Sequence, residues 1–105
     1  MEAQANGASD LVVIAGALES ASAADARDVL HAAVDSGEGD LVVDLRDVSH
    51  IDATGLGVLV GAHRRAQRAD RRVVLRAVPP RIHRLLMVTR LHRVIASEPL
   101  DVSIV

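Results

Sequence analysis

The residues with the clearest potential for chemistry lie in one run between an apolar stretch and a helix. Residues 51–61, IDATGLGVLVG, place an acid, a hydroxyl and glycines shortly after the apolar, strand-like residues 41–45. Backbone N–H groups at a helix N-terminus have no partner inside the helix and can bind an anion or a side-chain oxygen. Asp52 and Thr54 are both good helix caps, and we expect one of them to cap a helix over residues 55–69.

Three glycines, Gly55, Gly57 and Gly61, lie within this predicted helix. Each costs about 1 kcal/mol of helix stability against alanine, so the close approach of another backbone or protein is one explanation. Their spacing differs from the dinucleotide-binding fingerprint, and no Gly-Lys-Ser/Thr sequence follows them. Nucleotide binding by these glycines is therefore not favoured.

Other polar residues support catalysis or metal binding only weakly. Ser49, His50 and Asp52 are too close in one extended segment to converge as a catalytic triad. His50 and Asp52 could share a face, but a third metal ligand is not evident. His63 falls on an apolar helix face and is interpreted as a buried or half-buried residue rather than a ligand, and Asp44 as a loop hydrogen-bonding residue rather than a catalytic one. We expect a protein that is not an enzyme and needs no metal or cofactor.

Composition indicates one domain with an aliphatic core. The chain has 105 residues, half of them apolar, and it contains no Phe, Tyr, Trp or Cys. Such a core suits a buried parallel sheet, and without cysteine neither disulfides nor thiolate metal sites can form. The sequence shows no membrane-spanning run and no signal peptide, so a cytoplasmic protein is expected.

Charge is distributed unevenly along the chain. Residues 1–62 hold eleven acids and two arginines, whereas residues 63–105 hold ten arginines and three acids. Nucleic-acid binding is one interpretation of the basic half, but there are no aromatic side chains to stack on bases. A solvated surface is favoured, and the asymmetry could steer a charged protein partner.

Hydrophobic periodicity predicts alternating strands and helices. A capping box at Ser22–Asp25 should begin the first helix, and Gly37 and Gly39 should end it. The sequence predicts strands over residues 11–15, 41–45, 73–78 and 94–95, loops over 16–20 and 46–50, a turn at 70–72 and a third helix after Pro79. Weaker signals predict a hairpin turn at Asn6-Gly7 that follows an edge strand over residues 1–5, and a terminal strand through Leu100, Val102 and Ile104.

This order predicts an α/β fold with a mostly parallel sheet of four or five strands and interleaved helices. Right-handed crossovers between successive strands produce such a sheet. We expect one domain over residues 1–105.

The same residues resemble the central motif of STAS domains, especially the stand-alone bacterial anti-sigma factor antagonists. The resemblance rests on residues 41–45, Val48 and 51–60, with 16–19 similar to the family's Gly-Glu-Leu-Asp loop. Residues 85–95 resemble the end of the family's third helix. The match covers about residues 11–96 in order and at family spacing.

The resemblance implies a partner-switching protein that regulates transcription. Such antagonists bind an anti-sigma factor, a serine kinase, and are phosphorylated on a hydroxyl directly after the motif Asp. That position is Ala53 here, so the resemblance implies an antagonist without the usual phosphorylation switch. Phosphorylation of Thr54 instead is less favoured. The implied partner-binding residues are Glu19, Asp52, Ala53, Thr54, Gly55, Gly57 and Gly61.

Three departures from the family pattern leave the partner open. Glu19 replaces the loop Asp, Arg90 replaces a helix-ending Gly, and the usual final helix after residue 96 is not expected. The alternatives are a structural STAS subunit of a transporter or signalling scaffold and, less favoured, a nucleotide-binding protein.

Overall fold

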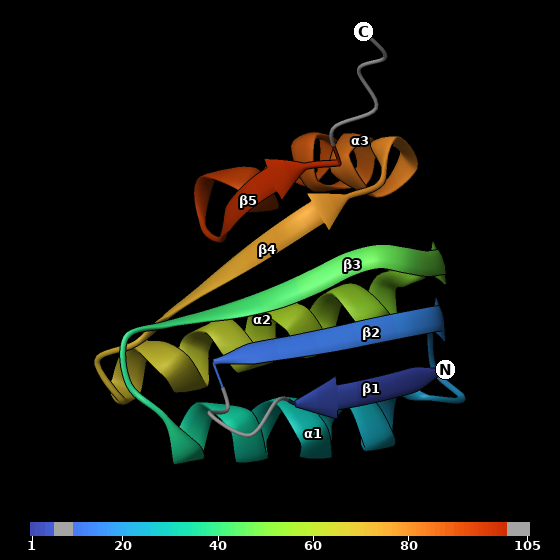
Figure 1. Ribbon diagram of the computed structural model, residues 1–105. Coiled ribbons are helices and arrows are strands. Elements are labelled where there is room, and N and C mark those ends of the chain that lie inside the picture. Colours follow the sequence, from blue (N-terminus) through green and yellow to red (C-terminus); the bar gives the residue numbers. More distant parts are fainter. Residues whose placement is uncertain (6–9, 101–105) are drawn as a thin grey trace, which may run out of the picture.

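Five strands form one sheet in the order β1-β2-β3-β4-β5, and helices connect its parallel strands (Figure 1). The computed structural model describes residues 1–5 and 10–100. The elements are β1 (Glu2–Ala5), β2 (Leu11–Leu18), α1 (Ala23–Ser36), β3 (Asp40–Ile51), α2 (Ala53–Arg68), β4 (Arg72–Val78), α3 (Pro80–Val88), the 3₁₀ helix η1 (Leu91–Arg93) and β5 (Ala96–Pro99). β1 is antiparallel to β2, and the other neighbouring pairs are parallel. The predicted α/β class and mostly parallel sheet are confirmed.

Helices α1 and α2 pack against each other and against the sheet (Figure 1). Every crossover advances by one strand in the same direction, so right-handed crossovers leave the connecting helices on one face. Alternate strand residues such as Ile14, Val43 and Leu75 are fully buried and form one cluster with Leu30 of α1 and Leu59 of α2. The core is therefore aliphatic. Within the described part of the chain, no helix is long and apolar enough to cross a membrane.

Strands β2 and β3 are longer than the sequence predicts. β2 continues to Leu18 and β3 to Ile51, so residues 16–18 and 46–50 are strand rather than loop. The two strands pair in parallel as far as Leu18 and Ile51, with two register shifts along the way. Pairing between strands satisfies the backbone of segments whose polar residues and glycine, read locally, are typical of loops.

At the two edges of the sheet, one strand lies where the sequence predicts it and the other begins later in the chain than predicted. β1 confirms the predicted edge strand near the N-terminus. The last strand is Ala96–Pro99 rather than 94–95, because the N–H groups of Val94 and Ile95 both donate to the carbonyl of Leu91. The predicted turn at Asn6-Gly7, and Val102 and Ile104 of the predicted terminal strand, lie outside the described residues.

The predicted capping box at the start of α1 is wrong. Ser22 occupies the cap position, but its side chain does not bond to the helix. Its Oγ instead donates to the carbonyl of Ala17 (2.9 Å) and accepts the N–H of Glu19 (3.1 Å). The hydroxyl therefore stabilises the loop between β2 and α1, a role it can take because the preceding chain folds back over it.

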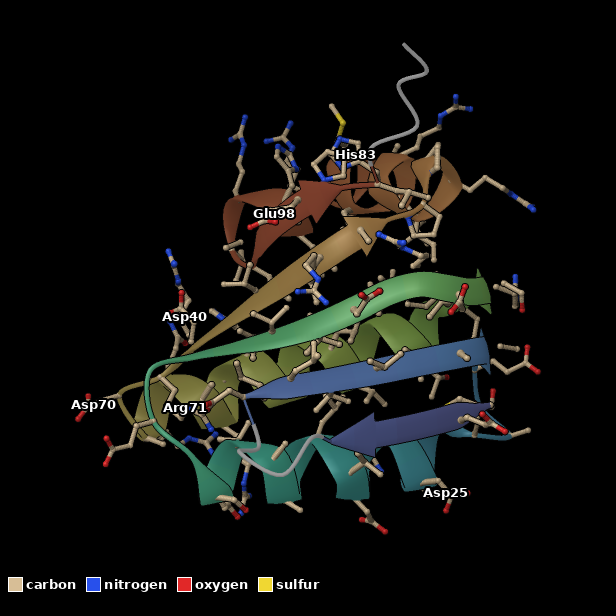
Figure 2. All side chains as sticks on the ribbon, viewed as in Figure 1. Asp25, Asp40, Asp70, Arg71, His83 and Glu98 are labelled. Atoms are coloured by element: carbon tan, nitrogen blue, oxygen red, sulfur yellow. The ribbon has the colours of Figure 1, made fainter. Side chains whose placement is uncertain are left out.

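Arg71, predicted as a turn residue, is a buried clamp at the end of α1 (Figure 2). Its side chain is 1 % exposed. The guanidinium donates to the carbonyls of Ala33 (2.8 Å), Val34 (2.9 Å), Gly39 (2.9 Å) and Glu38 (3.4 Å) and to Oδ1 of Asp10 (3.2 Å). Carbonyls at a helix C-terminus have no partner inside the helix. Arg71 donates hydrogen bonds to two such carbonyls of α1 and joins the helix to the loop before β3.

The departure from the family pattern at Arg90 has a visible backbone consequence. Arg90 has φ of 62°, a left-handed conformation that favours glycine. It follows Thr89, whose Oγ1 donates to the carbonyls of Leu85 (2.8 Å) and Leu86 (3.2 Å) at the end of α3. The chain therefore ends this helix in the usual left-handed way, with an arginine at the position where glycine is favoured.

Replacing Arg71 should destabilise the fold strongly. We expect Arg71→Ala to lower the free energy of unfolding by about 3 kcal/mol, because buried carbonyls lose charge-assisted hydrogen bonds. Urea denaturation measures the change. Arg72→Ala is the matched control, since its pair with Asp40 is exposed and should contribute little. Equal losses in the two variants would contradict the clamp.

Candidate functional site

The candidate site lies where the loop after β2, the end of β3 and the N-terminus of α2 meet. Asp52 lies between β3 and α2 and links all three segments. Its Oδ1 accepts the N–H of Gly55 (2.8 Å), and its Oδ2 accepts the N–H (3.3 Å) and the hydroxyl (3.4 Å) of Ser20. The predicted cap is therefore Asp52, and α2 begins at Ala53, two residues before the predicted start.

These donors also set the charge of Asp52. The Gly55 N–H, followed by the backbone and hydroxyl of Ser20 and the N–H of Thr54, holds the pKa of Asp52 below its usual value. Asp52 is thus an anion at neutral pH. Its hydrogen bonds stabilise the junction of helix and loop, as expected for a cap with a carboxylate at the positive end of a helix dipole.

Gly55 has an internal packing role. It is buried, and a Cβ at this position would overlap the carbonyl oxygen of Leu18 and lie 2.8 Å from Cγ1 of Ile51. The first turn of α2 therefore rests on the backbone at the end of β2. The close approach that the sequence suggested for this glycine is made inside the molecule, and Gly55 offers little surface to a partner.

Four other small residues of α2 lie toward the surface. Ala53, Thr54 and Gly57 are exposed, Gly61 is half-buried, and a Cβ at Gly57 or Gly61 would meet nothing within 4 Å. Nothing inside the described structure requires these two glycines. They leave a flat, uncharged stripe along α2, next to the capped carboxylate of Asp52.

Glu19 lies in the neighbouring loop and pairs with the end of β3. Its Oε2 is 3.8 Å from Nε2 of His50, and the two side chains are 40 % and 56 % exposed. Of the predicted site residues, the structure thus gathers Glu19, Asp52, Ala53 and Thr54 around one junction. Sequence reasoning missed Ser20; its signal was its position directly after the loop that resembles the family.

Several other candidates have structural roles. Oδ1 of Asp44 accepts the N–H of Arg46 (2.9 Å) and Oδ2 pairs with Arg76 (3.1 Å), so the hydrogen-bonding role is confirmed, although within a strand. His63 is 5 % exposed, which confirms its place in the core, and burial lowers its pKa. No hydrogen bond joins Ser49 or His50 to Asp52 in the described structure. The described residues contain no group of three side chains suited to a metal.

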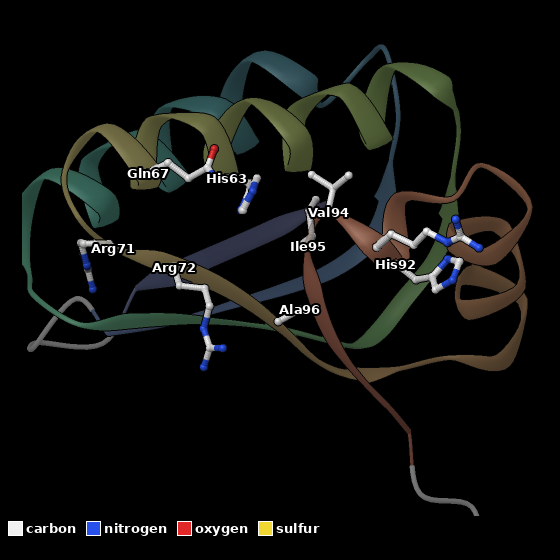
Figure 3. A pocket seen from close by; sticks show the side chains of 9 residues that line it. His63, Gln67, Arg71, Arg72, His92, Val94, Ile95 and Ala96 are labelled. Carbon is white, nitrogen blue, oxygen red and sulfur yellow. The ribbon is translucent and has the colours of Figure 1, made fainter.

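The pocket drawn in Figure 3 lies away from this junction. It has a volume of about 470 Å³ and is bounded by the second half of α2, the start of β4 and the η1–β5 segment. Two of its cations are occupied elsewhere, because Arg71 bonds to α1 and Arg72 pairs with Asp40 (2.8 Å). Nδ1 of His63 is buried there without a partner. Arg71 and Arg72 are therefore not free to bind a ligand in this pocket.

Comparison with known proteins gives consistent matches. A family model described as "Mlab, STAS domain" matches residues 1–97. An anti-sigma-B factor antagonist of Staphylococcus aureus (strain NCTC 8325 / PS 47) is 32 % identical over 80 residues, which cover 76 % of this chain and 74 % of the relative.

Two solved structures share the fold. A putative anti-sigma factor antagonist of Thermotoga maritima has a TM-score of 0.75 at 20 % identity, over 91 % of this chain and 83 % of that one. The Bacillus cell fate determinant SpoIIAA in its phosphorylated form has a TM-score of 0.68 at 16 % identity, over 92 % and 89 % of the two chains.

Alanine substitutions should distinguish the tightly packed Gly55 from the exposed Gly57 by their effects on the free energy of unfolding. We expect Gly55→Ala to lower the free energy of unfolding by about 3 kcal/mol, because the added Cβ collides with backbone. Gly57→Ala should instead raise it by about 1 kcal/mol through helix propensity. Chemical denaturation of both variants measures the changes. Similar effects in both would contradict the contact between α2 and β2.

The contribution of Asp52 should depend on pH. Its pKa is lower in the folded protein than in the unfolded chain, so its stabilisation is complete above about pH 4 and is lost as pH falls through the folded pKa. Asp52→Ala should melt below the wild type at neutral pH, and the gap should close in acid. Thermal melting across this range measures it. The control Thr54→Ala should show a gap that does not change with pH.

Proposed function

The chain belongs to the STAS domain family, and we propose that within this family it acts as an anti-sigma factor antagonist. Support comes from the Staphylococcus aureus relative with that name, which matches three quarters of both chains. The predicted resemblance to STAS domains is thereby confirmed. The residues that carry the resemblance, around Asp52 and Glu19, are also the ones that meet at the junction of β2, β3 and α2.

The surface at the start of α2 suits a partner that approaches closely. Ala53, Thr54 and Gly57 are exposed and uncharged, and the carboxylate of Asp52 is held by backbone and side-chain donors. Small side chains on a rigid helix allow another backbone or a flat protein surface to come near without displacing side chains. These features support binding to a protein partner.

The observation that carries the proposal is the exposed methyl group of Ala53. In the anti-sigma factor antagonists that this chain resembles, the residue directly after the motif Asp is phosphorylated by the anti-sigma factor, which is a serine kinase. A phosphate adds about −1.5 to −2 charges, which would lie beside the anionic Asp52 in the interface. Ala53 has no oxygen to accept a phosphoryl group. We infer a constitutive antagonist that binds this kinase type and stays bound.

Restoring the hydroxyl should restore the switch. With ATP and purified serine-kinase anti-sigma factors from the same genome, the wild type should form a stable complex and no phosphoprotein. Ala53→Ser should become phosphorylated at residue 53 and lose affinity, because the phosphate repels the partner interface. Intact-mass measurement and analytical gel filtration check both outcomes.

Two controls complete this experiment. Thr54→Val in the Ala53→Ser background should still be phosphorylated, which assigns the acceptor to residue 53. Strong phosphorylation of the unmodified chain at Thr54 would contradict the constitutive antagonist. Failure to bind any anti-sigma factor, with binding to a transporter ATPase or permease instead, would support the structural STAS subunit as the function.

A further inference from the structure

Helix α3 has an exposed face that is both basic and apolar. At about 100° per residue, Arg81, Arg84, Met87 and Val88 fall within one arc of about 120°. All four are exposed, whereas Ile82 and Leu86 on the other side of the helix are buried. We call these four exposed residues the outer face of α3.

Large apolar side chains are concentrated at this end of the molecule. Five large hydrophobic residues are exposed in the described part of the chain, and three of them are Met87 (50 %), Val88 (75 %) and Val94 (53 %). Single exposed apolar residues are ordinary, but a group of them within eight positions is typical of an interaction surface. α3 contacts η1 and packs its buried residues Ile82 and Leu86 into the core, which leaves its opposite side to solvent.

The chain segment that carries this face has basic but no acidic side chains. Residues 79–97 contain four arginines and no Asp or Glu. No carboxylate of the described residues pairs with Arg81, Arg84, Arg90 or Arg93, whereas other arginines of the chain do form such pairs. Figure 2 shows guanidinium groups and a methionine sulfur that project outward around α3. These cations are therefore available to an anionic partner.

A small pocket connects the outer face of α3 to the candidate site. It has a volume of about 190 Å³ and lies between Ser49, His50 and Ile51 at the end of β3 and Arg81, Ile82 and Leu85 of α3. Ile51 and Ile82 are buried and provide an apolar wall, and Arg81 lies at the boundary with the outer face. His50 also pairs with Glu19, so pocket and junction are continuous.

We propose that the outer face of α3 and this pocket bind an acidic protein surface, one apolar side chain of which fills the pocket. The proposal rests on the proposed function, because that acidic surface belongs to the partner that contacts Ala53. Acidic groups at Glu19 and Asp52 and basic groups on α3 form a surface with two poles. Such a pattern orients a partner and speeds its association. A lipid bilayer would match the charge, but it could not fill a concave pocket.

Charge reversal on α3 tests the proposal. Arg81→Glu/Arg84→Glu should weaken binding of the serine-kinase anti-sigma factor at least about tenfold, mainly through slower association, and should reduce its salt dependence. The matched control is Arg27→Glu/Arg46→Glu, which reverses two exposed arginines on α1 and β3 and should change affinity little. Surface plasmon resonance at several salt concentrations measures both, and circular dichroism checks folding.

A second probe works without any anti-sigma factor. A short peptide with one leucine between glutamates should shift the amide NMR signals of Ile51, Ile82 and Leu85, and a lysine version should not. Loss of these shifts in Arg81→Glu/Arg84→Glu is expected.

The outcomes separate this proposal from the proposed function. Binding of the anti-sigma factor that is unchanged by the α3 reversals overturns the α3 surface and leaves the function intact. Peptide shifts without any anti-sigma factor binding support the surface and contradict the function. Sedimentation with phosphatidylglycerol vesicles that the α3 reversals abolish, without peptide shifts, would assign the face to a membrane and overturn the protein partner.

Discussion

The position of the candidate surface depends on one close contact between the backbone of β2 and the first turn of α2. Gly55 has no Cβ, so the helix can lie directly on the carbonyl of Leu18. Asp52 then reaches the same helix turn and the loop residue Ser20 with its two oxygens. With any larger residue at position 55, the helix would have to move outward, and the loop that carries Glu19 would no longer flank Ala53.

Hydrogen bonds from buried or partly buried polar side chains fix the positions of the helices on the aliphatic core. Burial of Val, Leu, Ile and Ala stabilises the fold, but the hydrophobic effect does not itself fix the position of a helix along a sheet. Asp52 fixes the start of α2, and Arg71 fixes the end of α1 through two of its last carbonyls. Because both groups bond to backbone, they hold the helix layer in one position, and a binding partner meets a preorganised surface.

The same surface combines a neutral centre with opposite charges on its two sides. Exposed small residues of α2 lie beside the anionic Asp52, while the arginines of α3 lie across the pocket at the end of β3. A neutral centre tolerates close contact, since no charge must be desolvated there. The flanking charges decide orientation. An exposed methyl group at position 53 is compatible with permanent binding, whereas a phosphate there would add negative charge next to Asp52.

The sequence alone determined the class of fold, the presence of a polar cap at the start of α2 and the burial of His63. These features follow from periodicity and residue type within a few positions, which are local properties of the chain. Only the tertiary structure decided the lengths of β2 and β3, the contact of Ser20 with Asp52 and the burial of Arg71. Ser20 and Asp52 are 32 positions apart in the sequence. Arg71 is 38 and 37 positions from two of its acceptors, Ala33 and Val34. Such pairs form because the crossovers bring distant segments together. A polar residue that looks solvated in the sequence can therefore be buried in the fold, where the backbone groups of another element supply its hydrogen bonds.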